Sequence, residues 1–338
     1  MDSMSYNRPK LIVITPVRNE AWVLEAFLTC TSSWADYIII ADQHSTDGSR
    51  EIAARFPKVM LINNPCEEWV EYECRARLLE EAAKIKGDKI LFGIDADEFL
   101  SEGFDKTEGW KRIIESEPNE IFYFNWLNLY NNFHTVKTIE CRSEWVAHFA
   151  DDVDFVAEYR HTEKNAVHAS RVPCLPGSNC KYTFISDIQF VHVAKLNHQR
   201  TQNKVDFYQV VNFDKNPVKG NPVAMYRAYN DIYPRDIVTT KKDVSLYICG
   251  HSENGNSMIG TDAGLHFIEE ISAIMQREGT TKFAKLGIWG NPDILARITP
   301  PHRSLFLRIV MLYLKHTQPF YESKFIHLID SVLKRLVR

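Results

Sequence analysis

Short apolar runs alternate with longer amphipathic segments over the first hundred residues. The runs are rich in Ile, Leu and Val and predict buried strands, whereas the segments between them carry apolar residues near helical spacing. The predicted strands cover residues 11–14, 37–40, 59–62 and 90–94, and the predicted helices cover residues 20–33, 47–55 and 68–84. Regular alternation of this kind predicts an α/β fold with a mostly parallel sheet and helices on both of its faces.

The alternation ends after Leu100. The elements predicted beyond it are strands over residues 121–130 and 188–192 and a helix over residues 201–213. Two Pro and one Gly within residues 216–222 indicate a linker, and the remaining chain is mostly helical by its pattern. We therefore expect an α/β domain over residues 1–215 and a helical extension over residues 216–338.

Composition indicates a globular protein with a substantial core, because 45% of the 338 residues are hydrophobic and 25% are charged. The net charge of −4 gives no reason to expect a nucleic-acid partner. Seven cysteines without a C-x-x-C pair argue against a structural zinc site and a full disulfide framework. The first ten residues are polar and no apolar run reaches about 18 residues, so the cytoplasm is the expected location.

The charge is concentrated at the C-terminal end. Residues 302–338 hold seven Lys or Arg against two Asp or Glu, a net charge of +5, which leaves −9 for the rest of the chain. Residues 324–338 also carry an apolar stripe at helical spacing: Phe325, Leu328, Ile329, Val332, Leu333 and Leu336. Two interpretations remain open. Residues 303–338 contact the inner face of an anionic membrane peripherally, or the stripe packs on the preceding domain.

Candidate chemistry begins at the end of the strand predicted over residues 90–94. Asp95 and Asp97 follow this strand, at the edge where open α/β sheets bind their ligands. If the chain turns there, both carboxylates can face one Mg²⁺ or Mn²⁺ ion, since these cations prefer oxygen ligands. The alternative is that this D-x-D sequence merely ends a strand and solvates a loop.

Other polar segments follow the earlier strands and should converge on the same edge. Thr15 to Glu20 follows the first strand and Asp42 to Ser49 follows the second, while Arg75 and Arg77 lie on the third predicted helix. Asp42 can accept a hydrogen bond from a nucleotide base, and Arg77 or Arg75 can reach phosphate oxygens. Each feature also has a structural explanation: an Asp often caps a helix, and helical arginines are often solvated.

These segments together resemble the family 2 glycosyltransferases, which have the GT-A nucleotide-diphospho-sugar transferase fold. Residues 16–20 resemble the family's P-x-x-N-E turn, and residues 94–98 resemble its D-x-D-E metal motif. Residues 42–49 resemble its D-D-G-S-x-D-G-T segment, although Gln43 and His44 replace the second Asp and the Gly. Ala76-Arg77 matches an Ala-Arg-Asn helix. The resemblance covers residues 9–100 well and continues as scattered matches to about residue 210.

By this resemblance, residues 1–100 bind the nucleotide-sugar and residues 101–215 bind the acceptor. The donor, a UDP-sugar or GDP-sugar, would contact Thr15, Pro16, Arg18, Glu20, Asp42, Arg77, Asp95 and Ala96. Asp95 and Asp97 would hold Mn²⁺ or Mg²⁺, with His192 as the third ligand because it follows a strand in a recurrent segment. A histidine that simply ends a strand is the alternative for His192.

An inverting transfer also needs a carboxylate base for the acceptor hydroxyl. Residues 166–168 resemble a stretch in which relatives have His-Glu, but position 169 is Ala, so that base is missing. Asp187 is the first substitute, and Glu158 or Asp154 can also serve. Trp126, Tyr130, Trp145 and Tyr159 are candidates for stacking on a sugar, although strand aromatics usually belong to a core.

The resulting hypothesis is a metal-dependent glycosyltransferase that acts on a glycan or lipid-linked acceptor in cell-surface polysaccharide or lipopolysaccharide synthesis. Two alternatives remain. A non-catalytic nucleotide-sugar-binding protein would account for the missing Glu. A D-x-D phosphohydrolase would use Asp95 as its nucleophile, but such enzymes place the motif on their first strand and Phe99 occupies the position of their Thr or Val.

Overall fold

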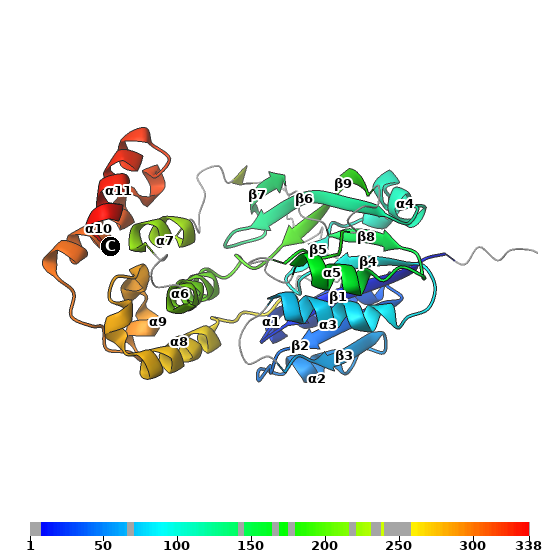
Figure 1. Cartoon of the computed structure of the whole chain (residues 1–338), viewed down its shortest axis with the longest axis horizontal. Helices are drawn as coiled ribbons and strands as arrows, with labels where there is room; N and C mark the ends of the chain where they lie inside the picture. Colours follow the sequence, from blue (N-terminus) through cyan, green and yellow to red (C-terminus); the bar gives the residue numbers. More distant parts are fainter. Residues whose placement is uncertain are drawn as a thin grey trace, which may run out of the picture. The chain divides into compact units, whose positions relative to one another are not determined.

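The computed structural model describes residues 8–65, 71–140, 145–163, 169–174, 180–215, 221–230, 238–239 and 258–337. The chain forms two compact units (Figure 1). The first unit comprises residues 1–194 and 239–260, and the second comprises residues 195–238 and 261–338. The division differs from the expected one at residue 215, because helix α6 (His198–Lys215) belongs to the second unit.

The first unit contains a sheet and the helices that flank it. Its strands are β1 (Lys10–Val17), β2 (Tyr37–Asp42), β3 (Val59–Asn63), β4 (Lys89–Gly93), β5 (Glu98–Leu100), β6 (Glu120–Leu129), β7 (Thr135–Glu140), β8 (Val146–Phe149) and β9 (Lys181–His192). Its helices are α1 (Ala21–Ser32), α2 (Ser49–Ala53), α3 (Glu71–Ala83), η1 (Phe104–Lys106), α4 (Glu108–Ile114) and α5 (Phe155–Glu163). A two-residue strand, β10 (Val238–Thr239), pairs with β7.

The described strands form one sheet of ten, in which β7, β6, β8, β4, β1, β2 and β3 are successive neighbours. The four strands predicted over the first hundred residues are parallel to one another, in the order β3-β2-β1-β4. Beyond β4 the sheet continues with antiparallel β8 and β6, while β9 runs parallel to β6 and pairs with β5. The predicted α/β class, with a parallel central sheet, is confirmed.

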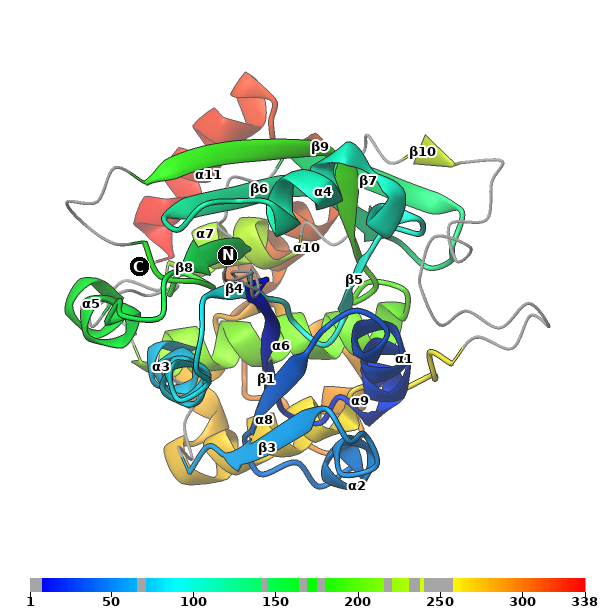
Figure 2. The same ribbon diagram turned by 90° about the vertical axis from the view of Figure 1, so that its right-hand side faces the viewer.

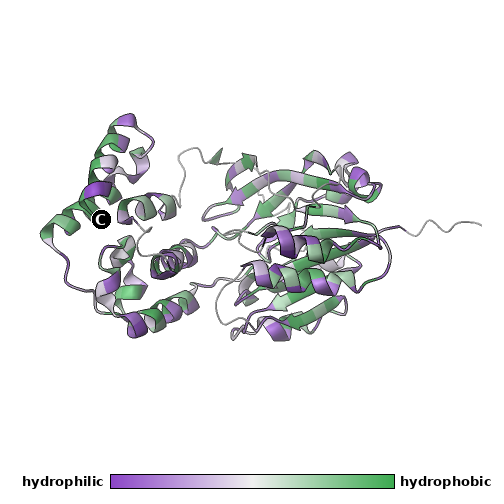
Figure 3. Ribbon diagram, in the orientation of Figure 1, coloured by the Kyte–Doolittle hydropathy of each residue, from purple (hydrophilic) through white to green (hydrophobic). Residues whose placement is uncertain are grey.

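Helices cover both faces of the parallel strands, as the alternation predicted (Figure 2). On one face, Ile12, Ile14 and Ile39 form a buried cluster with residues of α3 and α5. On the other face, Phe27 of α1 packs edge-on against Phe99 at a ring-centroid distance of 6.3 Å. The strands are coloured as largely hydrophobic in Figure 3, because a strand buried on both faces has no solvent-facing positions.

The second unit is helical, as predicted for the C-terminal part. Its elements are α6, α7 (Pro222–Tyr229), α8 (Leu265–Glu278), η3 (Thr280–Phe283), η4 (Gly287–Gly290), α9 (Pro292–Leu295), α10 (Leu305–Thr317), η5 (Gln318–Phe320) and α11 (Lys324–Leu336). Residues 216–220 of the predicted linker lie outside the described residues. Asn221 and Pro222 begin α7, because the Asn221 side chain accepts hydrogen bonds from the backbone N–H groups of Val223 and Ala224.

A buried polar network explains why α6 belongs to the second unit. Asn291 donates a hydrogen bond to Asp206 at 2.7 Å and another to Asn203 at 2.8 Å. Asn203 in turn donates to Asp293 at 2.8 Å, and both Asp206 and Asn203 are almost fully buried. The polar face of α6 therefore packs against complementary side chains near α9 instead of solvent.

In the described part of the chain, every helix is too short or too polar to cross a lipid bilayer.

Candidate functional site

The carboxyl ends of three parallel strands bring the predicted donor residues to one edge of the sheet. Val17 at the end of β1 is level with Asp42 at the end of β2, and Ile14 is level with Gly93 at the end of β4. With β1 between them, β2 and β4 are about 10 Å apart, since neighbouring strands are spaced about 4.8 Å, and Asp95 follows β4 by two residues. Both aspartates therefore lie on the same ligand-binding edge.

Asp42 is buried and has one carboxylate oxygen available for a ligand. Its Oδ2 accepts a hydrogen bond from Arg50 at 2.6 Å and one from the backbone N–H of Ser45 at 3.3 Å. Its Oδ1 is buried and has no hydrogen-bond partner among the described residues. Since an unsatisfied buried oxygen is costly, this atom fits the role predicted for it, accepting a hydrogen bond from a base.

The loops after β1 and β2 hold each other in place. Asn19 has a left-handed backbone (φ 55°), its N–H donates to the Ser45 hydroxyl, and its side-chain oxygen accepts from the Thr46 N–H. Asp47 accepts from the N–H groups of Ala21 and Ser49, so one carboxylate caps the starts of α1 and α2. The Asn of the P-x-x-N-E turn and the second acid of the next segment thus have structural roles here.

The other residues expected to contact the donor surround this edge. Thr15 is fully buried and its hydroxyl has no partner within the described ranges. Pro16 and Arg18 are half-buried beside it, and the Glu20 carboxylate accepts a hydrogen bond from the Trp22 indole at 2.6 Å. Ala96 is buried between the two aspartates of the D-x-D sequence.

Asp95 is held by two arginines. Its Oδ1 lies 2.9 Å from Nη2 of Arg75, and its Oδ2 lies 3.0 Å from Nη2 of Arg171. Burial would raise the pKa of Asp95, but the positive charges of Arg171 and Arg75 hold it below the usual value. Asp95 is therefore ionised at neutral pH, and its two oxygens are both engaged by cations of the chain.

Arg171 was not predicted from the sequence. It makes a two-pronged ion pair with the buried Glu98, at 2.7 and 2.9 Å, and its guanidinium lies over the Trp145 ring. Burial lowers the pKa of Arg171, but Asp95 and Glu98 outweigh this effect and raise it. Gly93 leaves room for the backbone of Arg171, because a Cβ there would lie 2.7 Å from the Arg171 carbonyl oxygen.

Arg75 contacts Asp95. The resemblance indicated Arg77 as a contact of the donor, and this stays a prediction. Arg75 is 2% exposed, yet its Nε and Nη1 groups have no hydrogen-bond partner in the described part of the chain. Arg77 is half-buried. Because Arg75 and Arg77 are two residues apart on a helix, their side chains leave α3 on different faces. Arg75 therefore has two buried nitrogens without a partner among the described residues, beside its ion pair with Asp95.

Asp97 and His192 face each other across the β5–β9 pair. Asp97 Oδ1 lies 3.6 Å from His192 Nε2, and the histidine stacks on Trp126. The Asn128 amide oxygen lies 2.8 Å from His192 Nδ1. Because an amide oxygen only accepts hydrogen bonds, Nδ1 carries a hydrogen, and Nε2 is the ring nitrogen that faces Asp97. One oxygen and one nitrogen ligand at this spacing fit a divalent cation.

The three predicted metal ligands are not assembled as one group. Among the described residues, no three His, Cys, Asp or Glu side chains are arranged to hold a metal. Asp97 and His192 form a pair, while Asp95 is engaged by Arg75 and Arg171. A cation at this site would therefore have two ligands from the pair and would take further ligands from substrate or water.

Two of the three predicted bases have structural partners, and the assignment of a base stays a prediction. Asp187 is exposed and accepts a hydrogen bond from the Gly109 N–H at the start of α4. It lies between Ile185 and Gln189, where the pairing of β9 with β6 shifts in register. Glu158 and Asp154 belong to the α5 region, where Asp154 caps the helix through the Ala157 N–H.

The aromatic candidates for sugar stacking are mostly core residues. Tyr130, Trp145 and Tyr159 are at most 1% exposed and pack in the core. Trp126 is half-buried and supports His192. His168 lies outside the described residues, and Ala169 beside it is buried.

No protein-family model matches the chain, and no curated protein sequence matches it. Glucosyl-3-phosphoglycerate synthase from Mycobacterium tuberculosis, in complex with Mn²⁺, UDP and glucosyl-3-phosphoglycerate, is 17% identical with a TM-score of 0.27, over 35% of this chain and 44% of that one. HddC from Yersinia pseudotuberculosis is 13% identical with a TM-score of 0.31, over 54% of this chain and 93% of that one. Mannose-1-phosphate geranyltransferase from Thermus thermophilus is 12% identical with a TM-score of 0.29, over 54% and 74%. This chain spans less than half the length of the first of these proteins.

Proposed function

We propose that this chain is a metal-dependent glycosyltransferase that uses a UDP-sugar or GDP-sugar. The observation that carries the proposal is the shared edge of the sheet, where buried Asp42, the Arg75–Asp95 pair and the Asp97–His192 pair lie at neighbouring strand ends. Hydrogen-bond acceptors at one end and cations at the other suit a molecule with a base at one end and a diphosphate at the other.

Each group then has a distinct task. The free oxygen of Asp42 accepts a hydrogen bond from the base, and the unused donors of Arg75 bind diphosphate oxygens. Asp97 and His192 hold the metal, which, when bound, supplies Lewis-acid stabilisation to the leaving diphosphate. Arg171 keeps Glu98 and Asp95 in place, so the D-x-D turn stays rigid before the donor arrives.

In the transfer, an acceptor hydroxyl oxygen bonds to the anomeric carbon while the bond from that carbon to the diphosphate oxygen breaks. The diphosphate departs with the electron pair, and the hydroxyl proton passes to a base. We propose a glycan or lipid-linked acceptor, in the synthesis of cell-surface polysaccharide or lipopolysaccharide, and inversion at the anomeric carbon.

The position of Asp187 favours a second candidate, a nucleotide-sugar-binding protein without catalysis. Asp187 was the leading base, and its carboxylate accepts a hydrogen bond from the Gly109 N–H at the start of α4. Hydrolysis of a nucleotide-sugar donor by the purified chain with Mn²⁺ would exclude this candidate. Binding of the donor without turnover would favour it over the transferase.

The metal and nucleotide roles can be tested by calorimetric titration of UDP, GDP, CDP and dTDP with and without Mn²⁺. We expect UDP or GDP to bind more tightly with Mn²⁺, and we expect Asp97→Asn or His192→Ala to remove that dependence. Asp152→Asn, at an exposed carboxylate in the first unit, is the matched control and should bind normally. Unchanged Mn²⁺-dependent binding in Asp97→Asn would refute the metal site.

A further inference from the structure

Helices α10 and α11 in the second unit leave many large apolar side chains uncovered. In α10 these are Leu305, Phe306, Ile309 and Leu312, and in α11 they are Phe325, Leu328, Val332 and Leu336. Seven of the eight are more than half exposed, from 52% for Val332 to 72% for Leu305, and Phe306 is 47% exposed. Figure 3 shows hydrophobic residues around both helices. Uncovered apolar residues concentrated on two adjacent elements indicate an interaction surface.

Each helix already uses a different face to pack within its unit. In α10, Leu307, Val310 and Leu314 are buried in a cluster with Val223 and Tyr226 of α7. At about 100° per residue, this buried face lies opposite the face formed by Leu305, Ile309 and Leu312. The exposed apolar residues of α10 are therefore a second apolar face that folding of the unit does not require.

Helix α11 repeats this arrangement. Ile326, Asp330 and Val337 are buried on one side, while Phe325, Leu328, Val332 and Leu336 lie on another side. Packing within the second unit therefore leaves these four residues of the C-terminal stripe uncovered, each at least half exposed. Leu333 is half-buried and does pack inward.

Basic residues border both exposed faces. Arg308 and Lys315 lie on one flank of the exposed face of α10, and Lys324 and Arg335 lie on the corresponding flank of α11, by the same angular spacing. All four are exposed. Of the two acidic residues in residues 302–338, Asp330 is buried against Arg227, so Glu322 is the only acid of this stretch at the surface.

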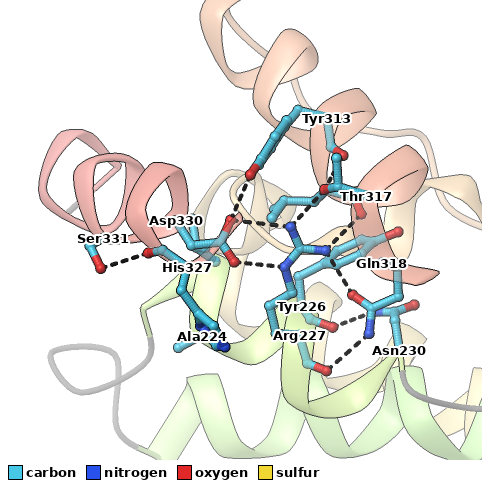
Figure 4. A network of polar contacts seen from close by, with 12 residues as sticks. Ala224, Tyr226, Arg227, Asn230, Tyr313, Thr317, Gln318, His327, Asp330 and Ser331 are labelled. Atoms are coloured by element: carbon cyan, nitrogen blue, oxygen red, sulfur yellow. Dashed lines mark hydrogen bonds and ion pairs between the residues drawn. The ribbon is translucent and has the colours of Figure 1, made fainter. Parts of the chain in front are cut away.

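An arginine fixes both helices to α7 (Figure 4). Arg227 of α7 pairs with Asp330 of α11 at 2.8 Å and donates hydrogen bonds to Thr317 and to the Leu314 carbonyl of α10. Tyr313 of α10 also donates to Asp330. The two exposed faces are therefore held in a defined arrangement before any partner binds, which lowers the entropic cost of docking.

We infer that the α10–α11 surface, defined as the eight apolar residues above with Arg308, Lys315, Lys324 and Arg335, docks onto an anionic lipid bilayer. Apolar side chains enter the boundary between head groups and acyl chains, and the flanking cations bind lipid phosphates. The inference goes beyond the proposed function and does not depend on it, because it uses no residue of the sheet edge.

Charge argues against a second copy of this chain as the occupant. Residues 302–338 carry a net charge of +5, so pairing two such surfaces would bring like charges together. A negatively charged bilayer satisfies the cations and the apolar residues at once, and it requires no complementary pocket.

The test is co-sedimentation of the full chain with vesicles of phosphatidylcholine alone or with equal parts of phosphatidylglycerol. We expect binding to the anionic vesicles, weak binding to the neutral ones, and weakening with salt. Lys324→Glu with Arg335→Glu should lower the binding constant at least about tenfold. Ile309→Gln with Leu328→Gln should lower it by a similar factor, because both side chains would insert.

The matched controls are Lys106→Glu with Lys111→Glu, at exposed lysines of the first unit, and Leu265→Gln with Leu295→Gln, at exposed leucines elsewhere in the second unit. Both controls should bind like the unaltered chain. No binding to anionic vesicles, equal binding by all variants, or self-association of the chain that depends on Ile309 and Leu328 would overturn the inference. Titration of the same variants with nucleotide tests the site at the sheet edge. A failure of the proposed function can therefore be distinguished from a failure of the membrane inference.

Discussion

Two buried arginines, one in each unit, differ in how completely their hydrogen bonds are satisfied. Arg227 in the second unit uses all five of its N–H groups, on Asp330, Leu314, Gln318 and Thr317. Arg75 in the first unit is more deeply buried, yet only its Nη2 is engaged, and two nitrogens have no partner in the described structure.

The difference separates a structural arginine from a binding one. When every donor of a buried cation has a partner, these interactions offset the cost of removing the cation from water. Its removal then leaves the partner groups buried and unpaired. A buried cation with unused donors costs stability unless another molecule supplies the missing acceptors. The first unit therefore retains an unfavourable arrangement at the strand ends, which is the arrangement expected of a ligand site.

The strongest test of this contrast is Arg227→Met. Asp330 would remain buried with Tyr313 as its remaining hydrogen-bond donor, and we expect a loss of about 3–5 kcal/mol in unfolding free energy. Denaturant unfolding of the full chain measures the change. Arg297→Met, which breaks a surface pair with Glu269, should cost less than about 1 kcal/mol. Similar losses in the two variants would contradict a structural role for Arg227.

Arg75→Met should have the opposite effect to Arg227→Met, with little change in stability and a clear loss of nucleotide binding. Asp95 keeps Arg171 as a partner, and two unsatisfied donors disappear, so the unfolding free energy of the free protein should change little. Nucleotide binding with Mn²⁺ should weaken by about 2–3 kcal/mol, the usual contribution of hydrogen bonds to a charged group. Calorimetric titration of nucleotide into the Arg75→Met and Arg77→Met variants shows which of the two arginines contributes to binding. A larger loss in Arg77→Met would contradict the role proposed for Arg75 and support the assignment of Arg77 from the family resemblance.

The sequence predicted the parts of this architecture that depend on local pattern. The β-branched runs identified β1 to β4, and the parallel order of these strands then placed Asp42 and Asp95 at one edge. Arg171 was missed because it lies 73 residues beyond Glu98 and has no local signature. The pairing of β5 with β9, which brings His192 to Asp97, is equally non-local, although the strand before His192 was visible.

Two other expectations depended on contacts that no local pattern shows. Asp187 was chosen as a base for its distance along the chain from the D-x-D sequence, but β9 has an irregularity in its pairing with β6 there, and Asp187 caps α4. Helix α6 was assigned to the first domain because the Pro and Gly residues within 216–222 indicated a linker after it. Asn291 and Asp293 bury polar residues of α6 in the second unit instead.

The same polar network predicts a pH dependence for the second unit. Burial raises the pKa of Asp206 to about 7, although Asn291 and Gln202 donate hydrogen bonds to it. Because the folded pKa lies above the unfolded one, the protonated acid favours folding, and this stability is lost as the pH rises toward 7. Between pH 5 and pH 8 we expect a loss of about 2 kcal/mol in unfolding free energy. Denaturant unfolding at both pH values measures it, and an unchanged pH slope in Asp206→Asn would contradict the assignment.

Arg50 differs from Arg227 and Arg75 because it is partly exposed, and its replacement should have the smallest effect of these substitutions. Its side chain is 39% exposed, and its Nη1 holds one oxygen of Asp42 at 2.6 Å, leaving the other oxygen for a base. If Arg50 only orients that carboxylate, Gln can still donate a neutral hydrogen bond, so Arg50→Gln should weaken nucleotide binding by less than about 1 kcal/mol. Asp42→Asn should weaken it more, because the amide can present a donor where the base needs an acceptor. If Arg50→Gln weakens nucleotide binding as much as Arg75→Met does, the exposed Arg50 contacts the nucleotide directly. Burial with unused donors would then not by itself identify the arginine that binds the nucleotide.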